Sequence, residues 1–342
     1  RYLDFFEYKC YLQVKIPRIK CPEHGVKVIG KTPWGRMGTH YSYSFEKWVM
    51  RLSAEMSMSA VSRELDEPDS NLWRVFQYYV NTAVDQQIDL KQVKRINVDE
   101  TAYKRGHSYI TIFSDKDSGD VIYVTEGRKK EVFGQLYGWL LDKNSNPSQI
   151  ELFCMDMSKS YIAGQRAYFK NSAVSFDRFH VKMAINKAVD KVRKQEVREC
   201  ESLKRTKYIW LKNETKLTSD EKLRLTGFLV EGTTKTATAY QLKTAFDRIW
   251  DIQPKAVANT LDAWLDMAWQ SGLKPMIKFV ETVDNHFQGI LNAIVSKTTN
   301  AMAEGINSLV QLARSRARGF RNMDNFIAMV YFLGNRFKLS FH

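Results

Sequence analysis

The chain has 342 residues, which is enough for two or three domains with full-sized cores. Its 52 Lys and Arg residues against 38 Asp and Glu give a net charge of +14, which favours a polyanionic partner such as nucleic acid. No apolar stretch approaches the roughly 20 residues of a membrane span, and no signal peptide is evident. The four cysteines are too few and too scattered for a disulfide framework. We therefore expect a cytoplasmic protein without a membrane partner.

The N-terminal residues 1–36 are interpreted as the tail of a small β module. Residues 11–16 alternate between polar and apolar types, and residues 18–25 form a knuckle. Within that knuckle, Cys21 and His24 have the C-x-x-H spacing that can supply two corners of a tetrahedral zinc site. Cys10 offers only one further ligand nearby, so the alternative is a turn with an incidental Cys and His.

The next region, residues 37–90, is predicted to hold three helices. Ser44 is the expected N-cap of the first helix, residues 57–65 form a short second one, and Ser70 is the expected N-cap of the third. A short helix, a tight turn and a longer helix make a helix-turn-helix, whose second helix can enter a major groove of DNA. A plain helical bundle is the alternative.

Strand patterns rich in β-branched and aromatic residues begin after this region. Five strands are predicted at residues 96–101, 107–114, 121–125, 150–155 and 173–176. The first and fourth of these apolar runs end on the acids Asp99 and Asp156. A carboxylate at the end of a buried strand is held rigidly at the rim of the sheet, which suits a hard metal ion. We therefore interpret Asp99 and Asp156 as two ligands of a catalytic magnesium ion.

Helical patterns dominate the second half of the chain. Residues 159–170 and 183–197 are predicted helices, and helical segments continue from residue 202 to about residue 287. The expected core residues of this stretch are Trp210, Leu217, Leu223, Leu225, Phe228, Tyr240, Phe246, Trp250, Trp264 and Trp269. The predicted fold class is α/β: a core of mixed strands and helices that carries an all-helical insertion.

A third acid is expected near the C-terminus, on a helix that begins near residue 299. Asn300, Glu304 and Asn307 recur at i, i+4 and i+7, so they form a polar stripe on one helix face. Arg314, Arg318 and Arg321 repeat this spacing further along the chain, on the condition that the helix continues that far; Gly319 is the candidate for its end. The acid would bind the ion and the guanidinium groups would neutralise flanking phosphates. The alternative is a solvated helix face with ordinary charges.

These segments together resemble the DDE transposases of bacterial insertion sequences, in particular the ISL-three family. The matching segments are Val98-Asp99-Glu100-Thr101, Gly106-His107-Ser108-Tyr109, Met155-Asp156-Met157-Ser158, Asp177-Arg178-Phe179-His180-Val181, residues 299–307, residues 316–322, residues 17–25 and Pro33-Trp34. The resemblance covers nearly the whole chain, and the order of the motifs is more specific than any single one. The zinc-binding C-x-x-C that precedes the knuckle in the family is absent here.

The resemblance implies a ribonuclease-H-like core with a catalytic triad of Asp99, Asp156 and Glu304, which binds Mg²⁺ or Mn²⁺. It implies that Asp177, His180 and Asn300 support the ligands or contact the element ends rather than bind the metal. Zinc would belong to the N-terminal module of a longer protein. The implied division is a partial zinc-ribbon-like module at 1–36, a helix-turn-helix at 37–90, the first part of the core at 91–200, a helical insertion at 201–289 and the rest of the core at 290–342.

The implied activity is cleavage of DNA at the element ends, followed by joining of the freed 3′-hydroxyl to target DNA through two metal ions. The implied partners are the terminal inverted repeats and target DNA of a bacterial nucleoid, bound by a homo-oligomer. Two other classes stay open: a structure-specific nuclease of the same fold, and an inactive or truncated transposase that serves as a DNA-binding protein. A nucleotide-driven enzyme is disfavoured because no G-x-x-x-x-G-K-[ST] loop occurs.

Overall fold

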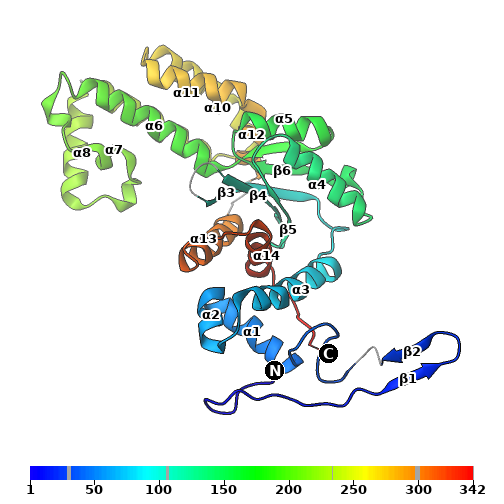
Figure 1. Cartoon of the computed structure of the whole chain (residues 1–342). Coiled ribbons are helices and arrows are strands. Elements are labelled where there is room, and N and C mark those ends of the chain that lie inside the picture. Colours follow the sequence, from blue (N-terminus) through cyan, green and yellow to red (C-terminus); the bar gives the residue numbers. More distant parts are fainter. Residues whose placement is uncertain (29–31, 105–107, 233, 297–300, 342) are drawn as a thin grey trace. The chain divides into compact units, whose positions relative to one another are not determined.

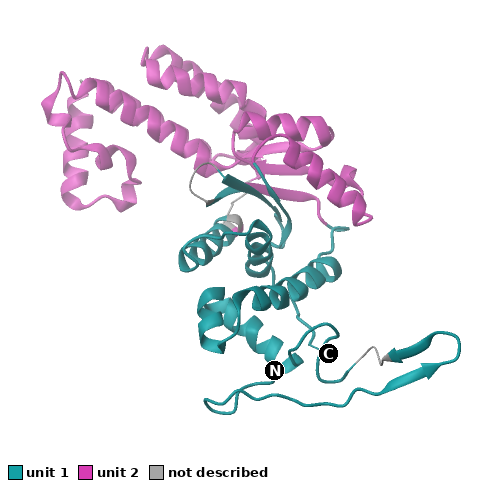
Figure 2. Ribbon diagram, viewed as in Figure 1, with its two compact units in different colours: residues 1–92, 100–127, 303–342 teal, residues 93–99, 128–302 magenta. Residues whose placement is uncertain are grey.

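The structure is a computed structural model that describes residues 1–28, 32–104, 108–232, 234–296 and 301–341 (Figure 1). The chain divides into two compact units, which are described separately (Figure 2). Unit 1 comprises residues 1–92, 100–127 and 303–342, and unit 2 comprises residues 93–99 and 128–302. Both units are discontinuous in sequence, and the division falls inside one strand, between Asp99 and Glu100.

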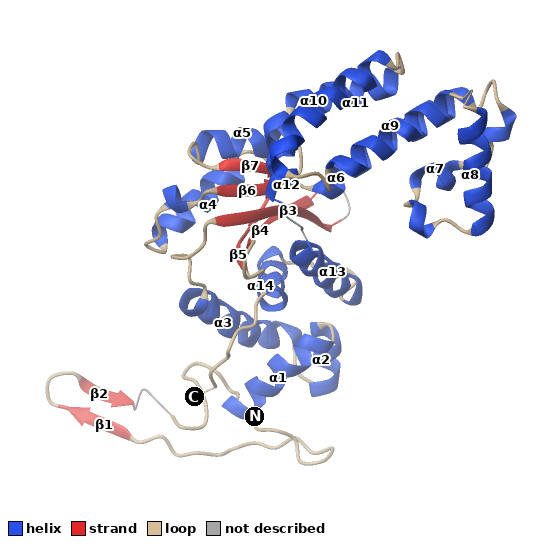
Figure 3. Cartoon of the chain, turned by 180° about the vertical axis from the view of Figure 1, so that it is seen from behind, coloured by secondary structure: helices blue, strands red, loops and turns tan. Residues whose placement is uncertain are grey.

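Two sheets are present among the described residues (Figure 3). The strands are β1 (Arg18–Cys21), β2 (Gly25–Val28), β3 (Arg95–Lys104), β4 (Ser108–Asp115), β5 (Val121–Glu126), β6 (Leu152–Met155) and β7 (Ala173–Phe176). The first two form an antiparallel hairpin, and the other five form a mixed sheet in the order β5–β4–β3–β6–β7. Within it, β4 and β5 are antiparallel, whereas β6 is parallel to both β3 and β7. The predicted mixed sheet of five strands is therefore confirmed.

Unit 1 contains the N-terminal helices and the C-terminal end of the chain. Its helices are α1 (Tyr43–Glu55), α2 (Met58–Leu65), α3 (Asp69–Gln87), α14 (Met323–Gly334) and all but the first two residues of α13 (Ala301–Arg316). Helix α14 packs against both α3 and β5. The Tyr331 hydroxyl on α14 accepts a hydrogen bond of 3.0 Å from the Val124 amide of β5, and the rings of Phe76 and Phe332 meet edge to face at 5.0 Å. These contacts tie the helix-turn-helix region to the last helix of the chain.

Both predicted N-caps of the helix-turn-helix region are wrong by two residues, and the helix predicted to start at residue 183 begins at Arg178. The first helix is capped by Ser42, whose side chain accepts from the Phe45 amide, and not by Ser44. Ser42 and Ser44 both precede the apolar positions of the helix at a spacing that suits an N-cap, so the sequence alone does not show which of them caps the helix. The third helix begins at Asp69 after Pro68, with no side-chain cap, so Ser70 already lies inside it. Proline fixes the backbone angle that leads into this helix without a capping hydroxyl.

Unit 2 is mainly helical outside its strands. Its α-helices are α4 (Glu131–Asp142), α5 (Lys159–Tyr168), α6 (Arg178–Glu196), α7 (Lys207–Leu211), α8 (Ser219–Glu231), α9 (Lys235–Ile249), α10 (Pro254–Gln270), α11 (Lys274–Asn285) and α12 (Phe287–Ser296). Short 3₁₀ helices lie at Pro147–Gln149, Glu201–Leu203 and Glu214–Lys216. Helix α6 packs against α7, α9 and α11, and α12 packs against β7.

One hydrophobic cluster joins β7 and α6 to the helices that follow. It is built around large buried side chains, including Trp210, Phe246 and Trp264. Two residues expected in this core are instead exposed: Leu223 at 76% and Trp269 at 55%. Helix α8 buries only Leu225 among its residues, and α10 turns Trp264 and Ala268 inward, so the next residue along α10 faces outward.

None of the described helices combines the length and the apolar composition needed to cross a membrane.

Candidate active site

Three neighbouring strands of the mixed sheet carry acidic residues close to one another in register. Strands β3, β6 and β7 are parallel, and the register pairs Asn97 with Cys154 and Met155 with Phe176. Asp156 and Asp177 directly follow β6 and β7, whereas Asp99 lies within β3, which continues to Lys104, so the expectation that this strand ends on Asp99 is wrong. Extended by one or two residues, these registers would bring the backbone of Asp99 and of Asp177 next to Asp156, at the spacing of about 4.8 Å between neighbouring strands.

The two predicted strand-end ligands, Asp99 and Asp156, are both half-buried. Fully buried side chains anchor the strands behind them, among them Ile96 on β3 and Phe153 on β6. One oxygen of Asp156, Oδ1, accepts a hydrogen bond of 2.9 Å from the amide of Ser158, the residue before α5. The backbone that carries this carboxylate is therefore held by the sheet on one side and by a turn into a helix on the other.

Asp177 has a different local role, because it starts helix α6. Its Oδ1 accepts from the amide of Phe179 at 2.9 Å, which makes it the N-cap of the helix. Its Oδ2 lies 4.0 Å from Nε2 of His180, one turn into α6. This carboxylate is thus engaged in starting a helix, which agrees with its interpretation as a support and not a metal ligand. The third residue of that group, Asn300, lies outside the described residues.

Glu304 belongs to the other unit. It is exposed in the first turn of α13, while Ile306 and Val310 of the same helix are buried. An acid in the first helical turn is favoured by the helix dipole. The structure therefore brings Asp99 and Asp156 to adjacent strands of one unit, whereas Glu304 stands on a separate element. Within the described part of the chain, no group of three or more His, Cys, Asp or Glu residues could hold a metal ion.

The expected zinc ligands are close to each other in the β1–β2 hairpin. Sγ of Cys21 lies 3.3 Å from Nδ1 of His24, on an exposed turn. A tetrahedral zinc site needs two more ligands. The same described residues supply no group of three ligands here, so the zinc site stays an expectation.

The condition for an arginine stripe on one helix face is not met, because the helix ends near Gly319. Helix α13 ends at Arg316, and the chain is then reversed by left-handed backbone at Arg318 (φ 55°) and Gly319 (φ 97°). Arg321 therefore lies in the segment between α13 and α14. Arg314 is on the helix, and its Nη1 donates to the carbonyl of Ala102 at 2.7 Å.

The helix-turn-helix is formed by α2 and α3. Ser57 caps α2 by accepting from the Ala60 amide, and Asp66 ends it in the left-handed conformation. Pro68 then leads into α3. Two further exposed arginines lie on these elements: Arg74 on α3 and Arg316 at the end of α13. Arg74 was not singled out from the sequence, although a basic residue in the second helix of a predicted helix-turn-helix was the available signal. Arg316 is within the matching segment 316–322, but it was given no role.

The sequence of the chain matches two protein families and several curated proteins. A family described as "Transposase" matches residues 96–330, and one described as "Helix-turn-helix domain of transposase family ISL3" matches residues 31–80. A curated relative from Mycobacterium tuberculosis, "Transposase for insertion sequence element IS1557", is 22% identical over 96% of this chain and 80% of its own length. A relative from Bordetella parapertussis, "Transposase for insertion sequence element IS1001", is 22% identical over 96% of this chain and 82% of its own length. The chain therefore belongs to the ISL3 family of transposases.

Proposed function

We propose that the chain cuts DNA phosphodiesters at the ends of an insertion sequence and joins the freed 3′-hydroxyl to target DNA. Membership of a transposase family and the helix-turn-helix support the substrate class. The observation that supports the chemistry is the parallel register between β3 and β6, which, extended by two residues, would bring Asp99 next to Asp156. The proposed core is ribonuclease-H-like and is formed by residues 91–200 and 290–342, with residues 201–289 as a helical insertion.

The paired carboxylates suit a divalent cation. Two carboxylates on neighbouring strands would repel each other, and a cation held between them would offset this repulsion. Carboxylate oxygens are the ligands that Mg²⁺ and Mn²⁺ prefer, and Mg²⁺ takes its remaining ligands from water and substrate phosphates. Asp99 and Asp156 would hold the metal, with Glu304 as the proposed third ligand from α13. When bound, the metal ions would stabilise charge on the phosphoryl oxygens and activate the attacking hydroxyl.

The protein's own residues have the tasks of binding and positioning. Asp99 would anchor the site to the middle of β3 and Asp156 to the end of β6, where the turn from Asp156 to Ser158 holds the second carboxylate. Asp177 keeps α6 in place beside them by capping its first turn. The helix-turn-helix of residues 37–90 binds the element ends, and the net positive charge of the chain favours contacts with the phosphate backbone. We also propose that the protein acts as a homo-oligomer on DNA, because two element ends have to be held together.

A joining assay tests this proposal. The protein is incubated with Mg²⁺, a labelled linear DNA that carries the genomic sequences flanking the coding region, and a supercoiled plasmid. We expect nicking at the element end and labelled products joined to the plasmid. Asp99→Asn, Asp156→Asn and Glu304→Gln should each abolish both steps while the protein still binds the labelled DNA. Asp142→Asn, a change of an exposed acid at the end of α4, is the matched control and should retain activity.

The products distinguish the proposed activity from its alternatives. Nicked DNA without joined products would identify a nuclease and overturn the joining step. DNA binding without any cleavage by the unaltered protein would identify a DNA-binding derivative. Joined products from any of the three altered proteins would remove that residue from the proposed triad.

A further inference from the structure

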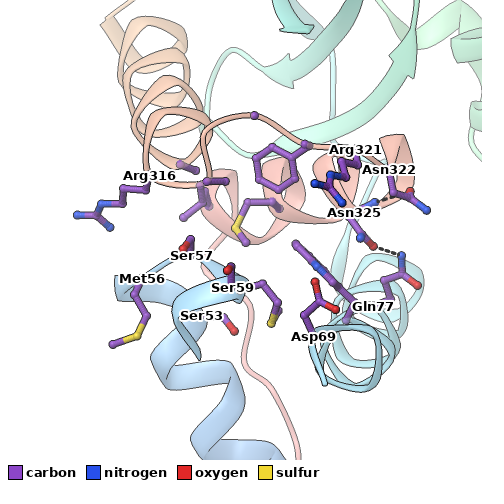
Figure 4. A pocket seen from close by; sticks show the side chains of 18 of the residues that line it. Ser53, Met56, Ser57, Ser59, Asp69, Gln77, Arg316, Arg321, Asn322 and Asn325 are labelled. Atoms are coloured by element: carbon purple, nitrogen blue, oxygen red, sulfur yellow. Dashed lines mark hydrogen bonds between the residues drawn. The ribbon is translucent and has the colours of Figure 1, made fainter. Parts of the chain in front are cut away.

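A groove in unit 1 lies between the helix-turn-helix and the C-terminal helices (Figure 4). Its volume is about 670 Å³. One wall is the N-terminal half of α3, and the other is the end of α13 with the segment that leads into α14. Two segments that are more than two hundred residues apart in sequence therefore enclose one cavity.

The α3 wall is the part of a helix-turn-helix that normally reaches base edges. Asp69, Ser70, Trp73, Arg74 and Gln77 line it. In a helix-turn-helix, the N-terminal residues of the second helix contact the bases in the major groove. Asp69, Ser70 and Arg74 are exposed, so this end of α3 is accessible along the groove.

The opposite wall adds positive charge. Arg316 and Arg321 line it, and with Arg74 they give three guanidinium groups against the single carboxylate of Asp69. Across the described structure, the guanidinium groups of Arg74 and Arg321 form no hydrogen bond or ion pair with another residue. Arg316 donates only to the backbone carbonyl of Glu55, at 2.8 Å, so its charge is not neutralised by a carboxylate. The groove is therefore electrostatically suited to an anion with several charges.

The groove is held in shape by contacts between its two walls. Nε2 of Gln77 on α3 donates to Oδ1 of Asn325 on α14 at 2.7 Å, as the dashed line in Figure 4 marks. The rings of Trp73 and Phe320 meet at 6.1 Å. Exposed apolar side chains of α13, Leu309 and Leu312, complete the lining. A polyanion that also presents apolar surface, as the deoxyribose of DNA does, matches both parts of the lining.

We propose that this groove seats the sugar–phosphate backbone of the DNA whose bases α3 reads. Residues 316–325 would then be a second DNA-binding element, working with the helix-turn-helix to recognise the element end. Phosphate contacts of this kind fix the position and orientation of a recognition helix on the duplex. This inference rests on the proposed function for the identity of the DNA, but it makes a separate claim about which residues hold it.

The test compares three arginine substitutions that remove the same charge. Arg321→Gln and Arg74→Gln change the two walls of the groove. Arg336→Gln changes an exposed arginine beyond α14 that does not line it. Binding of a fluorescein-labelled duplex with the genomic sequence flanking the coding region is measured by anisotropy over a series of salt concentrations. Each phosphate contact contributes about 0.9 to the slope of log K against log salt.

We expect Arg321→Gln and Arg74→Gln each to weaken binding and to lower the magnitude of this slope by about 0.9. Arg336→Gln should leave the slope unchanged, and thermal unfolding of all three proteins should match that of the unaltered chain. Groove variants that behave like Arg336→Gln would overturn the inference while leaving the proposed function intact. Failure of the unaltered protein to bind the duplex would contradict both. If the groove variants sediment differently from the unaltered chain in the absence of DNA but keep its salt slope, the inference is overturned and the groove is instead a contact surface for a second copy of the chain.

Discussion

Arg36 forms three hydrogen bonds to the carboxylate of Glu46, a side chain with no exposed surface; in the longest of them, Nε donates to Oε1 at 3.2 Å. Nε of Arg36 donates to Oε2 at 2.9 Å and Nη2 donates to Oε1 at 2.7 Å. The hydroxyl of Tyr79 on α3 donates to the same carboxylate at 2.6 Å. Burial alone would lower the pKa of Arg36, but the hydrogen bonds and charge of Glu46 outweigh it and raise that pKa. One carboxylate therefore links the segment before α1 to α1 itself and to α3.

Substitution of Glu46 by Gln should destabilise unit 1 strongly. It leaves a largely buried guanidinium without its counter-charge, and breaking such a pair costs about 3–5 kcal/mol. Glu55→Gln changes an exposed acid of the same helix and is the matched control. Chemical denaturation followed by the fluorescence of Trp48 and Trp73 measures the difference. Equal midpoints for the two variants would contradict a stabilising role for the buried pair.

Replacement of Gly289 by Ala should disturb the packing of α12 on β7. A Cβ at this position would lie 2.3 Å from Cε2 of Phe176, the last residue of β7. Forcing extra atoms into a packed core costs about 1–3 kcal/mol. Because Asp177 follows Phe176 directly, we also expect reduced DNA cleavage at moderate temperature.

The matched control for this change is Gly138→Ala on α4. A Cβ there would meet no atom within 4 Å, and alanine is the better helix former by about 1 kcal/mol. The melting temperature should therefore fall for Gly289→Ala and stay or rise for Gly138→Ala. A fall of the same size in both proteins would show that the contact with Phe176 is not the cause.

The stability of unit 2 should decrease in mild acid because of His286. Burial and, secondarily, the positive charges of Arg166 and Lys159 lower the pKa of this imidazole below its ordinary value of 6.5. The unfolded chain then binds a proton that the folded chain does not. The stabilisation is present above pH 6.5 and is lost as the pH falls towards the lowered pKa.

Denaturation midpoints measured between pH 8 and pH 5 test this effect. We expect the unaltered chain to lose stability over this interval and His286→Gln to lose less. His24→Gln, a change on the exposed hairpin turn, should lose as much stability between pH 8 and pH 5 as the unaltered chain. An unchanged pH profile in His286→Gln would assign the acid sensitivity to other groups.

The elements of this fold could be read from local patterns, whereas their pairing could not. The runs of β-branched residues around Val98 and Val124 predicted two of the strands, because turn residues bound each run. The register that sets Asp99 beside Asp156 depends on strands 57 residues apart, and no local pattern encodes it. The apolar runs that precede the two acids pointed to Asp99 and Asp156, and the structure adds the parallel pairing of β3 with β6.

Errors arose where a local rule depended on context. The arginine stripe required α13 to continue past Arg316, but left-handed residues reverse the chain there. Leu223 and Trp269 are apolar, yet they fall on the outward faces of α8 and α10. Arg316 was given no role in the sequence analysis because α3, with which it lines the groove, is remote in sequence. Long-range packing decides each of these cases.

The central claim is that Asp99 and Asp156 bind divalent metal ions together. Electron paramagnetic resonance of Mn²⁺ titrated into the protein–DNA complex measures this directly and without reference to catalysis. We expect bound Mn²⁺ with the unaltered chain and with Asp142→Asn, and a loss of affinity of at least about tenfold with Asp99→Asn or Asp156→Asn, as one lost ligand removes more than 1.4 kcal/mol. Equal Mn²⁺ affinity in all four proteins would contradict the claim.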